Sequence, residues 1–572
     1  MLEDHRRCGW GTVLAAVTLF ATLLLAVPAT PAAAAAGGRI SVIVRHNAGT
    51  GAQTEALVRR LGGTVGRRLG IIDGFAATVP VAAEARLRSG PGIHSVTRNQ
   101  PVRLNTVDGF DAKAYSASTM YWVAQEVTGA GEYWNDGYTG RGVDVALLDS
   151  GVVEVEGLGD GNVVYGPDLS YEAHVPELEH KDTFGHGTHM AGIIAGRDSD
   201  APARIEKGDE DHFLGMAPDA RLVSLKLADA SGATDVSQVI AGIDWVVQNR
   251  NRNGLNIRVL NLSFGTDGVQ SYLLDPLTYA VEVAWRKGIV VVVSAGNEGY
   301  GSAKLNNPAY DPHILAVGGA DGAGTYDYKD DTIQDWSSRG DGTRNPDLVA
   351  PGASILSLRD PGSAIDAEHP TARVADRFFK GTGTSQAAAV VSGAAALVIQ
   401  QRPTITPDQV KALLTGGAQR LRKADPVAQG HGMLDLKFVR DRVTPTAMAA
   451  AQPFPYASGL GSLEAARGSS HVQNQAGDVL IGEEDAFGGV WDGRRWRADS
   501  WDGATWTSGE WSATAFTGGT WNGRRWSGAT WASGTWTGGT WNGRRWSGDT
   551  WAGRRWSGDT WAGRRWSGGG WN

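Results

Sequence analysis

The chain has 572 residues, a net charge of −8 and 20% charged residues, a length that suits three or four domains. The charge argues against a nucleic-acid-binding protein and against a disordered acidic one. Cys8 is the only cysteine, and it lies in a segment that we expect to be removed. A mature form would therefore have no disulfide, no thiol chemistry and no cysteine-ligated zinc.

The N-terminus has the three parts of a secretory signal. Two arginines precede an apolar run, Val13–Val27, and an alanine-rich stretch to Ala36 follows. The apolar run is shorter than the roughly 20 residues that span a bilayer, which disfavours an uncleaved anchor. No later segment is long and apolar enough to cross a membrane. We therefore expect residues 1–36 to be a signal peptide and the protein to be secreted.

Residues 39–103 have the pattern of a small separate unit. Apolar spacing predicts strand, helix, strand, strand, helix and strand in turn. These elements are expected at 39–45, 53–61, 64–69, 74–79, 81–87 and 93–97. The order βαββαβ is that of a ferredoxin-like α+β fold. A polar, glycine-containing stretch at 105–119 is predicted as an accessible linker. Such a unit could be a binding module, but its place between a signal and a larger domain suggests a propeptide, residues 37–118.

A larger domain follows, with alternating apolar strands and helices. Strands are expected at 143–148, 257–265 and 289–297, and helices at 235–248, 272–286 and 385–401. This alternation predicts an α/β fold with a doubly wound, mainly parallel sheet. The last helix has no charge or proline before Arg402-Pro403, where proline stops it. Ser385 thus lies at a helix N-terminus, which suits a nucleophile that passes through an oxyanion. Taken alone, it is better interpreted as a helix cap.

Two further polar residues mark the same domain. Asp149 follows the apolar strand 143–148, at the end where parallel sheets collect ligands. His186 opens an apolar helix 37 residues later, within Gly-His-Gly-Thr-His. A metal site at His186 and His189 would need a third ligand at suitable spacing, and none is present. We therefore expect no metal there.

Three sequence blocks together resemble a known family. Asp149-Ser-Gly, His186-Gly-Thr-His-Met-Ala-Gly and Gly383-Thr-Ser385 are similar to the signature blocks of the subtilisin-like serine peptidases, the subtilases. They stand in that family's order, Asp, His, Ser, at separations of 37 and 199 residues. Any single block is a weak signal, but three in order are not. The resemblance covers about 119–440 and is to the secreted bacterial type with an inhibitor-like propeptide.

The resemblance implies a serine endopeptidase that works through an acyl-enzyme and is made as an autoprocessed zymogen. Ser385 would be the nucleophile, His186 the base and Asp149 its orienting carboxylate, with the Asn297 amide and the Ser385 N–H holding the oxyanion. Glu298 would tune the substrate pocket toward basic side chains or be a solvated surface carboxylate. The pocket walls would be Ser263, Phe264, Gly265, Ser294, Ala295 and Gly296.

The expected partners are protein or peptide substrates and the chain's own propeptide, with no nucleic acid, and we expect a monomer. No cofactor is required. Six carboxylates gather between Asp198 and Asp211 and could bind Ca²⁺, although a solvated acidic loop is the preferred interpretation. The alternative function is a catalytically silent protein that binds cell wall or polysaccharide.

The C-terminal part differs in composition. Residues 441–490 are predicted as a linker, and from Trp491 to Trp571 an aromatic residue falls at every fifth position, 16 tryptophans and Phe516. A five-residue period suits neither one helical face nor one face of a strand. Repeated turns, as in a β-repeat, are therefore expected for the tail, 491–572. The tail carries a net charge of +5. It could dock on a polysaccharide or cell wall, stack on itself as a structural repeat, or be a flexible tail.

Overall fold

The structure is a computed structural model. It describes residues 39–47, 49–69, 74–98, 119–159, 161–173, 175–268, 270–299, 304–323, 328–472 and 479–499, with tail backbone at 525–526, 545–546, 556–557 and 560–561. The chain divides into two compact units, Met1–Asn99 and Gln100–Asn572. The predicted signal peptide and, apart from Thr119, the predicted linker at 105–119 lie outside the described residues. No helix in these ranges is long and apolar enough to span a bilayer.

The first unit has the predicted βαββαβ order. Its elements are β1 (Arg39–His46), α1 (Gly51–Arg60), β2 (Thr64–Leu69), β3 (Gly74–Pro80), the 3₁₀ turn η2 (Val81–Ala83), α2 (Glu84–Arg88) and β4 (Ile93–Arg98). The strands form an antiparallel sheet in the order β2-β3-β1-β4. Val42 and Val44 alternate onto one face of β1, where Val58 and Leu87 of the two helices pack with them. The ferredoxin-like prediction is therefore confirmed as a fold.

The second unit is built on an eight-stranded sheet. Its strands are β5 (Asp144–Asp149), β6 (Val163–Asp168), β7 (Arg221–Lys226), β8 (Ile257–Leu262), β9 (Val290–Ser294), β10 (Leu315–Asp321), β11 (Thr332–Ile333) and β12 (Leu348–Pro351). They lie in the order β11-β10-β9-β8-β5-β7-β6, with β12 beside β10, and only β11 is antiparallel to its neighbour. The predicted doubly wound α/β sheet is confirmed.

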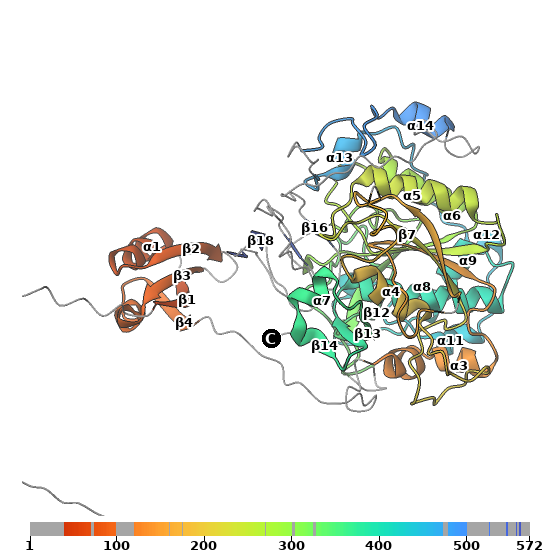
Figure 1. The fold of residues 1–572 in the computed structure, drawn as a ribbon, viewed down its shortest axis with the longest axis horizontal. Helices are drawn as coiled ribbons and strands as arrows, with labels where there is room; N and C mark the ends of the chain where they lie inside the picture. The colour runs from red at the N-terminus through yellow and green to blue at the C-terminus, as the bar shows by residue number, and fades with distance from the viewer. Residues whose placement is uncertain are drawn as a thin grey trace, which may run out of the picture. The chain divides into compact units, whose positions relative to one another are not determined.

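Four long helices cover the two faces of this sheet (Figure 1). Helices α4 (His186–Ala195) and α8 (Thr384–Gln401) pack together on one face, and α5 (Val236–Asn249) and α6 (Pro276–Arg286) pack together on the other. Because both faces are covered, β5 is buried along its whole length, which explains why its sequence is continuously apolar between two aspartates. Helix α6 begins four residues later than predicted, because Asp275 caps it and Pro276 occupies its first turn.

The remaining elements complete the unit. They are η3 (Tyr121–Val127), α3 (Ala130–Asn135), β13 (Ile355–Leu358), α7 (Ala364–Glu368), η5 (Pro370–Ala372), β14 (Arg373–Val374), β15 (Phe378–Gly381), α9 (Pro407–Gly417), α10 (Pro426–Gln429), α11 (Leu436–Arg440), α12 (Ala447–Ala450), α13 (Leu463–Arg467) and α14 (Gly493–Asp499). The tail strands are β16 (Arg525–Trp526), β17 (Arg545–Trp546), β18 (Trp556–Ser557) and β19 (Thr560–Trp561). Strands β16 and β17 pair in parallel, and β18 and β19 pair antiparallel.

The described part of the predicted linker, 441–472 and 479–490, is folded against the sheet domain. Helix α12 packs on α9, and α13 packs on α5 and α6; α13 and α14 lie over the outer side of α5 and α6 in Figure 1. The linker prediction is wrong for these residues. Their Pro-, Gly- and Ser-rich composition produces irregular backbone, but Leu463, Ala466 and Arg467 are nonetheless fully buried.

The repeat also begins on this surface. Trp491 and Trp496 are buried, with their rings 5.0 Å apart, and Trp496 lies edge-on to Tyr279 of α6 at 5.4 Å. Residues Gly493–Asp499 form α14, so the expectation of repeated turns is wrong for these residues. The first two tryptophans are therefore part of the folded unit and are not exposed indoles.

Candidate active site

Asp149 and His186 meet at the carboxyl end of the central strand. Asp149 is the last residue of β5, and His186 is the first residue of α4. The Nδ1 atom of His186 lies 2.6 Å from Oδ1 of Asp149, and both side chains are buried. When Asp149 accepts the Nδ1–H, Nε2 becomes the basic nitrogen of a neutral imidazole. The pair is thus arranged as a general base with an orienting carboxylate.

A second carboxylate, Asp182, holds the turn that carries His186. Its oxygens accept the N–H groups of Gly185 and Thr188 at 2.6 and 2.7 Å and the hydroxyl of Ser150 at 2.7 Å. The turn is also tightly packed, because a Cβ on Gly187 would lie 2.0 Å from the carbonyl oxygen of Gly151. Burial raises the pKa of Asp182. The sequence analysis did not single out Asp182, although an aspartate a few residues before a helix can accept the N–H groups of its first turn.

Ser385 and Asn297 come from neighbouring elements of the same edge. Ser385 is the second residue of α8 and is fully buried, and Asn297 lies in the loop after β9. The amide oxygen of Asn297 accepts the N–H of Thr384 at 2.8 Å, while its Nδ2 has no hydrogen-bond partner among the described residues. A buried donor without a partner costs about 1–3 kcal/mol. That cost is understandable if the donor is kept for a ligand.

The four residues therefore lie in two groups, each held by a direct hydrogen bond. Asp149 contacts His186, and Asn297 binds the residue just before Ser385. Helices α4 and α8, which carry His186 and Ser385, pack against each other and against β5. Both residues lie in the first turn of their helices, as the sequence predicted.

The six predicted wall residues lie in two adjacent segments. Strands β8 and β9 are parallel neighbours, so the segments that follow them leave the sheet side by side. All six residues are buried: Ser263, Phe264 and Gly265 after β8, and Ser294, Ala295 and Gly296 at the end of β9. The N–H of Gly296 donates to the hydroxyl of Thr384 at 3.3 Å, which places this wall beside Ser385.

Asn306, which sequence reasoning missed, fills the space between the two walls. A Cβ on Gly265 would lie 2.8 Å from the Cβ of Asn306, and one on Gly296 would lie 2.6 Å from its Cγ. Its side chain is buried, and neither amide atom has a hydrogen-bond partner among the described residues. Asn306-Asn307-Pro308 is a turn signal in the sequence, and it gives no sign of this contact.

Glu298 is buried, and its N–H donates to the Ser338 hydroxyl at 3.0 Å. The alternative that it is a solvated surface carboxylate is therefore wrong. Its neighbour Asn297 and the wall segment that ends at Gly296 precede it directly in the chain, so the Glu298 backbone belongs to the same loop.

His189 is a structural histidine. Its Nε2 lies 3.0 and 3.2 Å from the carbonyl oxygens of Phe379 and Ile355, which makes Nε2 an N–H donor. Burial, with a smaller contribution from His186, lowers the pKa of His189 to about 3. The ring is therefore neutral near pH 7, and its Nε2 is occupied as a donor and not as a metal ligand.

Three of the six carboxylates of the acidic loop lie against basic side chains. Asp198 lies 2.5 Å from Arg377, Glu206 lies 2.8 Å from Arg204, and Asp209 lies 2.9 Å from His212. No group of three or more His, Cys, Asp or Glu side chains converges in the described ranges. Calcium prefers six to eight oxygen ligands, and this loop offers no such arrangement.

Comparison with known proteins gives a consistent set of relatives. Residues 140–432 match the profile of the Subtilase family, peptidase S8. The serine protease AprX of Bacillus subtilis (strain 168) is 35% identical over 320 residues, which are 54% of this chain and 70% of that protein. Subtilisin E of the same organism is 28% identical over 434 residues, 75% of this chain and 97% of that protein. Among solved structures, a cold adapted subtilisin-like serine proteinase is 28% identical, with a TM-score of 0.39 over 52% of this chain and 90% of that chain.

Proposed function

Because the chain belongs to the subtilase family of serine peptidases, we propose that it hydrolyses peptide bonds with Asp149, His186 and Ser385 as a catalytic triad. The observation that carries the proposal is the 2.6 Å contact between the buried His186 ring and the Asp149 carboxylate. Helix packing supports it, since α4 and α8 bring the first turns of two helices to the same sheet edge.

In this mechanism the Ser385 hydroxyl attacks the peptide carbonyl carbon, and His186 accepts the hydroxyl proton. The C–N bond then breaks, His186 gives that proton to the leaving amine, and an acyl-enzyme remains on Ser385. Water attacks the acyl-enzyme with His186 again as the base, which releases the acid and restores the serine. Asp149 keeps the ring in the required tautomer and stabilises the imidazolium that forms in each half of the reaction.

The developing oxyanion would be held by two N–H donors. One is the amide of Asn297, whose oxygen is tied to Thr384 while its Nδ2 has no partner within the described residues. The other is the backbone N–H of Ser385, in the first turn of α8, where the helix dipole favours negative charge. This arrangement needs no cofactor.

The proposal is tested by covalent labelling. A fluorophosphonate reacts with an activated serine, so the purified protein should be modified at Ser385, as located by peptide mass spectrometry, and should hydrolyse casein. Preincubation with a peptide substrate should slow the labelling. A protein that neither reacts nor cleaves casein would instead fit the alternative, a silent protein that binds cell wall or polysaccharide.

We also propose that the chain is exported and matured by proteolysis. Residues 1–36 would be the signal peptide, and residues 37–118, which include the folded βαββαβ unit, would be an inhibitory propeptide that assists folding. Similarity to a relative named Minor extracellular protease Epr, of Bacillus subtilis (strain 168), supports export, and the division of the chain after Asn99 supports removal of one folded piece. In this proposal residues 119–499 make up the mature catalytic unit.

Asn306 is proposed to limit the side chain that fits before the scissile bond. Replacing Asn306 by glycine removes the group that fills the space between Gly265 and Gly296. We expect kcat/KM for peptides with a large aromatic residue at that position to rise about ten-fold relative to peptides with a small polar residue. Profiling on a peptide library measures the ratio. An unchanged preference, with fluorophosphonate labelling as fast as in the unmodified protein, would contradict this role.

The tail beyond residue 499 is proposed to dock on a polysaccharide or cell wall. Its support is compositional: regularly spaced tryptophans beside arginines suit stacking on sugar rings and cation–π contacts. Deleting residues 500–572 should abolish co-sedimentation with cell walls or insoluble glycan while casein hydrolysis is retained. The cut spares Trp491 and Trp496, which belong to the folded unit. Equal co-sedimentation of the full and shortened proteins would contradict docking through the tail.

A further inference from the structure

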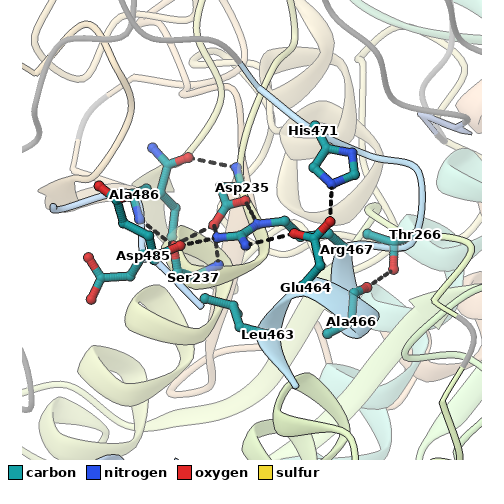
Figure 2. A network of polar contacts seen from close by, with 12 residues as sticks. Asp235, Ser237, Thr266, Leu463, Glu464, Ala466, Arg467, His471, Asp485 and Ala486 are labelled. Carbon is teal, nitrogen blue, oxygen red and sulfur yellow. Dashed lines mark hydrogen bonds and ion pairs between the residues drawn. The ribbon is translucent and has the colours of Figure 1, made fainter. Parts of the chain in front are cut away.

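The C-terminal segment forms a network of polar contacts with the sheet domain, at Asp235, Ser237 and Thr266 (Figure 2). We call residues 462–472 and 479–490, which include α13, the clasp. Its two halves are bonded to each other: Glu464 accepts the N–H of Gly482 at 2.8 Å, and Glu483 accepts the N–H of Leu463 at 2.9 Å. His471 lies 2.7 Å from the other Glu464 oxygen. These bonds join the two halves of the clasp. Its two main attachments to the sheet domain are at Arg467 and Ala466, and Ser469 and Ala486 make further contacts.

The first attachment is a buried ion pair between Arg467 and Asp235. Nε of Arg467 donates to Oδ2 of Asp235 at 2.6 Å and Nη2 donates to Oδ1 at 3.2 Å, and both side chains are fully buried. Asp235 is also the N-cap of α5, since it accepts the N–H of Ser237. Burial alone would raise the pKa of Asp235, but the Arg467 guanidinium and the hydrogen bonds from Ser237 together lower it. The remaining Arg467 donors reach the carbonyl oxygens of Gly482 and Glu484.

The second attachment is the carbonyl group next to Arg467. The Ala466 oxygen accepts the Thr266 hydroxyl at 2.6 Å and the Asn307 amide at 3.3 Å. Thr266 and Asn307 are also joined by two backbone hydrogen bonds, at 3.0 and 2.8 Å. Thr266 directly follows the wall residue Gly265, and Asn307 directly follows Asn306. One carbonyl group therefore ties the wall of the proposed pocket to the segment that fills it.

A third contact is made by Ser469, just after the end of α13. The N–H of Ser469 donates to Asp267 at 2.7 Å, and its hydroxyl donates to the same carboxylate at 3.0 Å. Asp267 stands two residues after Gly265. The loop after β8 is therefore held by the clasp at Thr266 and again at Asp267.

The two attachments belong to loops on either side of the candidate triad. Asp235 comes after β7, and Thr266 comes after β8, while β7 and β8 flank β5, whose last residue is Asp149. Because the strands are parallel, both loops leave the same carboxyl edge of the sheet. The clasp thus bridges the edge where the substrate would lie. Buried hydrogen bonds and an ion pair of this kind favour one geometry of the two loops.

We propose that Arg467 is a positioning residue for substrate binding. Its ion pair with Asp235 fixes the position of the neighbouring Ala466 carbonyl group, which binds Thr266 and Asn307. These two residues in turn position their chain neighbours Gly265 and Asn306, which form the proposed pocket. The inference rests on the proposed peptidase function. It assigns a part in substrate recognition to a segment beyond the residues that match the family, 140–432. Arg467 touches neither the substrate nor the reacting atoms, so its effect should fall on substrate affinity and not on the chemical step.

The test compares two arginine-to-lysine changes. Arg467→Lys keeps the charge but loses the planar fork that spans both Asp235 oxygens. The control is Arg221→Lys. Arg221 forms a similar two-pronged pair with Asp144, at 2.8 Å for each bond. This pair lies at the first residues of β7 and β5, away from the carboxyl edge that carries the candidate site. We expect Arg467→Lys to raise KM for a peptide substrate about ten-fold with kcat within two-fold, as loss of uniform binding does. The control should leave KM unchanged.

Thr266→Val provides a second variant that keeps the fold. It preserves the shape of a buried side chain and removes only the hydroxyl that binds the Ala466 carbonyl, so KM should rise several-fold. The rate of fluorophosphonate labelling, which does not use the pocket, should stay within two-fold in every variant. Thermal unfolding of each variant in a Ser385→Ala background reports stability separately.

The outcomes are distinguishable. Unmodified protein that cleaves the peptide, with unchanged KM in both Arg467→Lys and Thr266→Val, would overturn the inference and reduce the clasp to a stabilising element. Equal KM increases in Arg467→Lys and Arg221→Lys would also overturn it, since the effect would then be general. Unmodified protein that neither cleaves nor labels would overturn the proposed function itself, and the clasp inference with it.

Discussion

Ser385→Ala is expected to lower the rate of peptide hydrolysis about 10⁶-fold, the loss that follows removal of a nucleophilic serine from such a site. The reason is that no other group on α8 can form the acyl-enzyme, and His186 then has no hydroxyl proton to accept. Fluorophosphonate labelling should disappear with the activity. Steady-state assays on a chromogenic peptide, together with intact mass after labelling, measure both.

The same substitution tests maturation. If the propeptide is removed by the chain's own active site, the Ser385→Ala protein should accumulate with residues 37–118 still attached, as intact mass would show. The matched control is Ser392→Ala in the same helix, where the hydroxyl donates to Asn261 at 2.9 Å. That variant should lose some stability but keep labelling and processing. Normal processing of the Ser385→Ala protein would show that another peptidase matures the chain.

Asn297→Ala is expected to lower kcat about 10²–10³-fold with little change in KM, because it removes one of two oxyanion donors. The Asn297 amide is already oriented by Thr384, so little reorganisation accompanies the reaction. A suitable comparison is Asn306→Ala, which alters another buried asparagine whose amide has no partner in the described ranges.

The two asparagine variants should therefore have different kinetic defects. Asn297→Ala should affect all peptides alike through kcat, while Asn306→Ala should change the preference among peptides. Full kinetics on two substrates that differ only at the residue before the scissile bond separate the two effects. An Asn297→Ala protein with kcat within ten-fold of the unmodified protein would remove Asn297 from the proposed mechanism.

Most of the sheet domain could be predicted because its signals are local. A strand covered on both faces is continuously apolar, as in β5 and β9, and a helix buried on most sides is rich in alanine and glycine, as in α8. Element ends were less well predicted where capping decides them. Helix α6 begins at Pro276 because Asp275 caps it, although the apolar spacing extends back to Tyr272.

The site was predictable to the extent that its residues sit in short motifs at strand and helix ends. Asp149, His186, Ser385 and Asn297 each follow or precede a strong secondary-structure signal. In the structure Asp149 contacts His186, and Asn297 binds the residue before Ser385. Asn306 and Arg467 carry no such signal. Their partners, Gly265 and Asp235, are distant in the sequence, and a contact between distant residues leaves no periodicity in either segment.

The composition of segment 441–490 predicts a linker, and this prediction is wrong for its described residues. Proline, glycine and serine predict irregular backbone, and that part is correct for much of the segment. Irregular backbone is nevertheless compatible with burial when its polar groups are bonded, as those of Arg467 are. An arginine at the end of a short helix such as α13 gives no hint in the sequence that its guanidinium is buried against a carboxylate.

The ion pair between Arg467 and Asp235 also limits how far the C-terminal end of the enzyme can be shortened without loss of stability. A fragment trimmed to the family match, 140–432, would leave the Asp235 carboxylate in a site built for an ion pair, and uncompensated buried charge is strongly destabilising. It would also uncover the Tyr279 ring that Trp496 now covers. The folded sheet domain therefore extends at least to Asp499, and it includes the first two tryptophans of the repeat. During synthesis, the substrate edge can be completed only after these last residues have emerged.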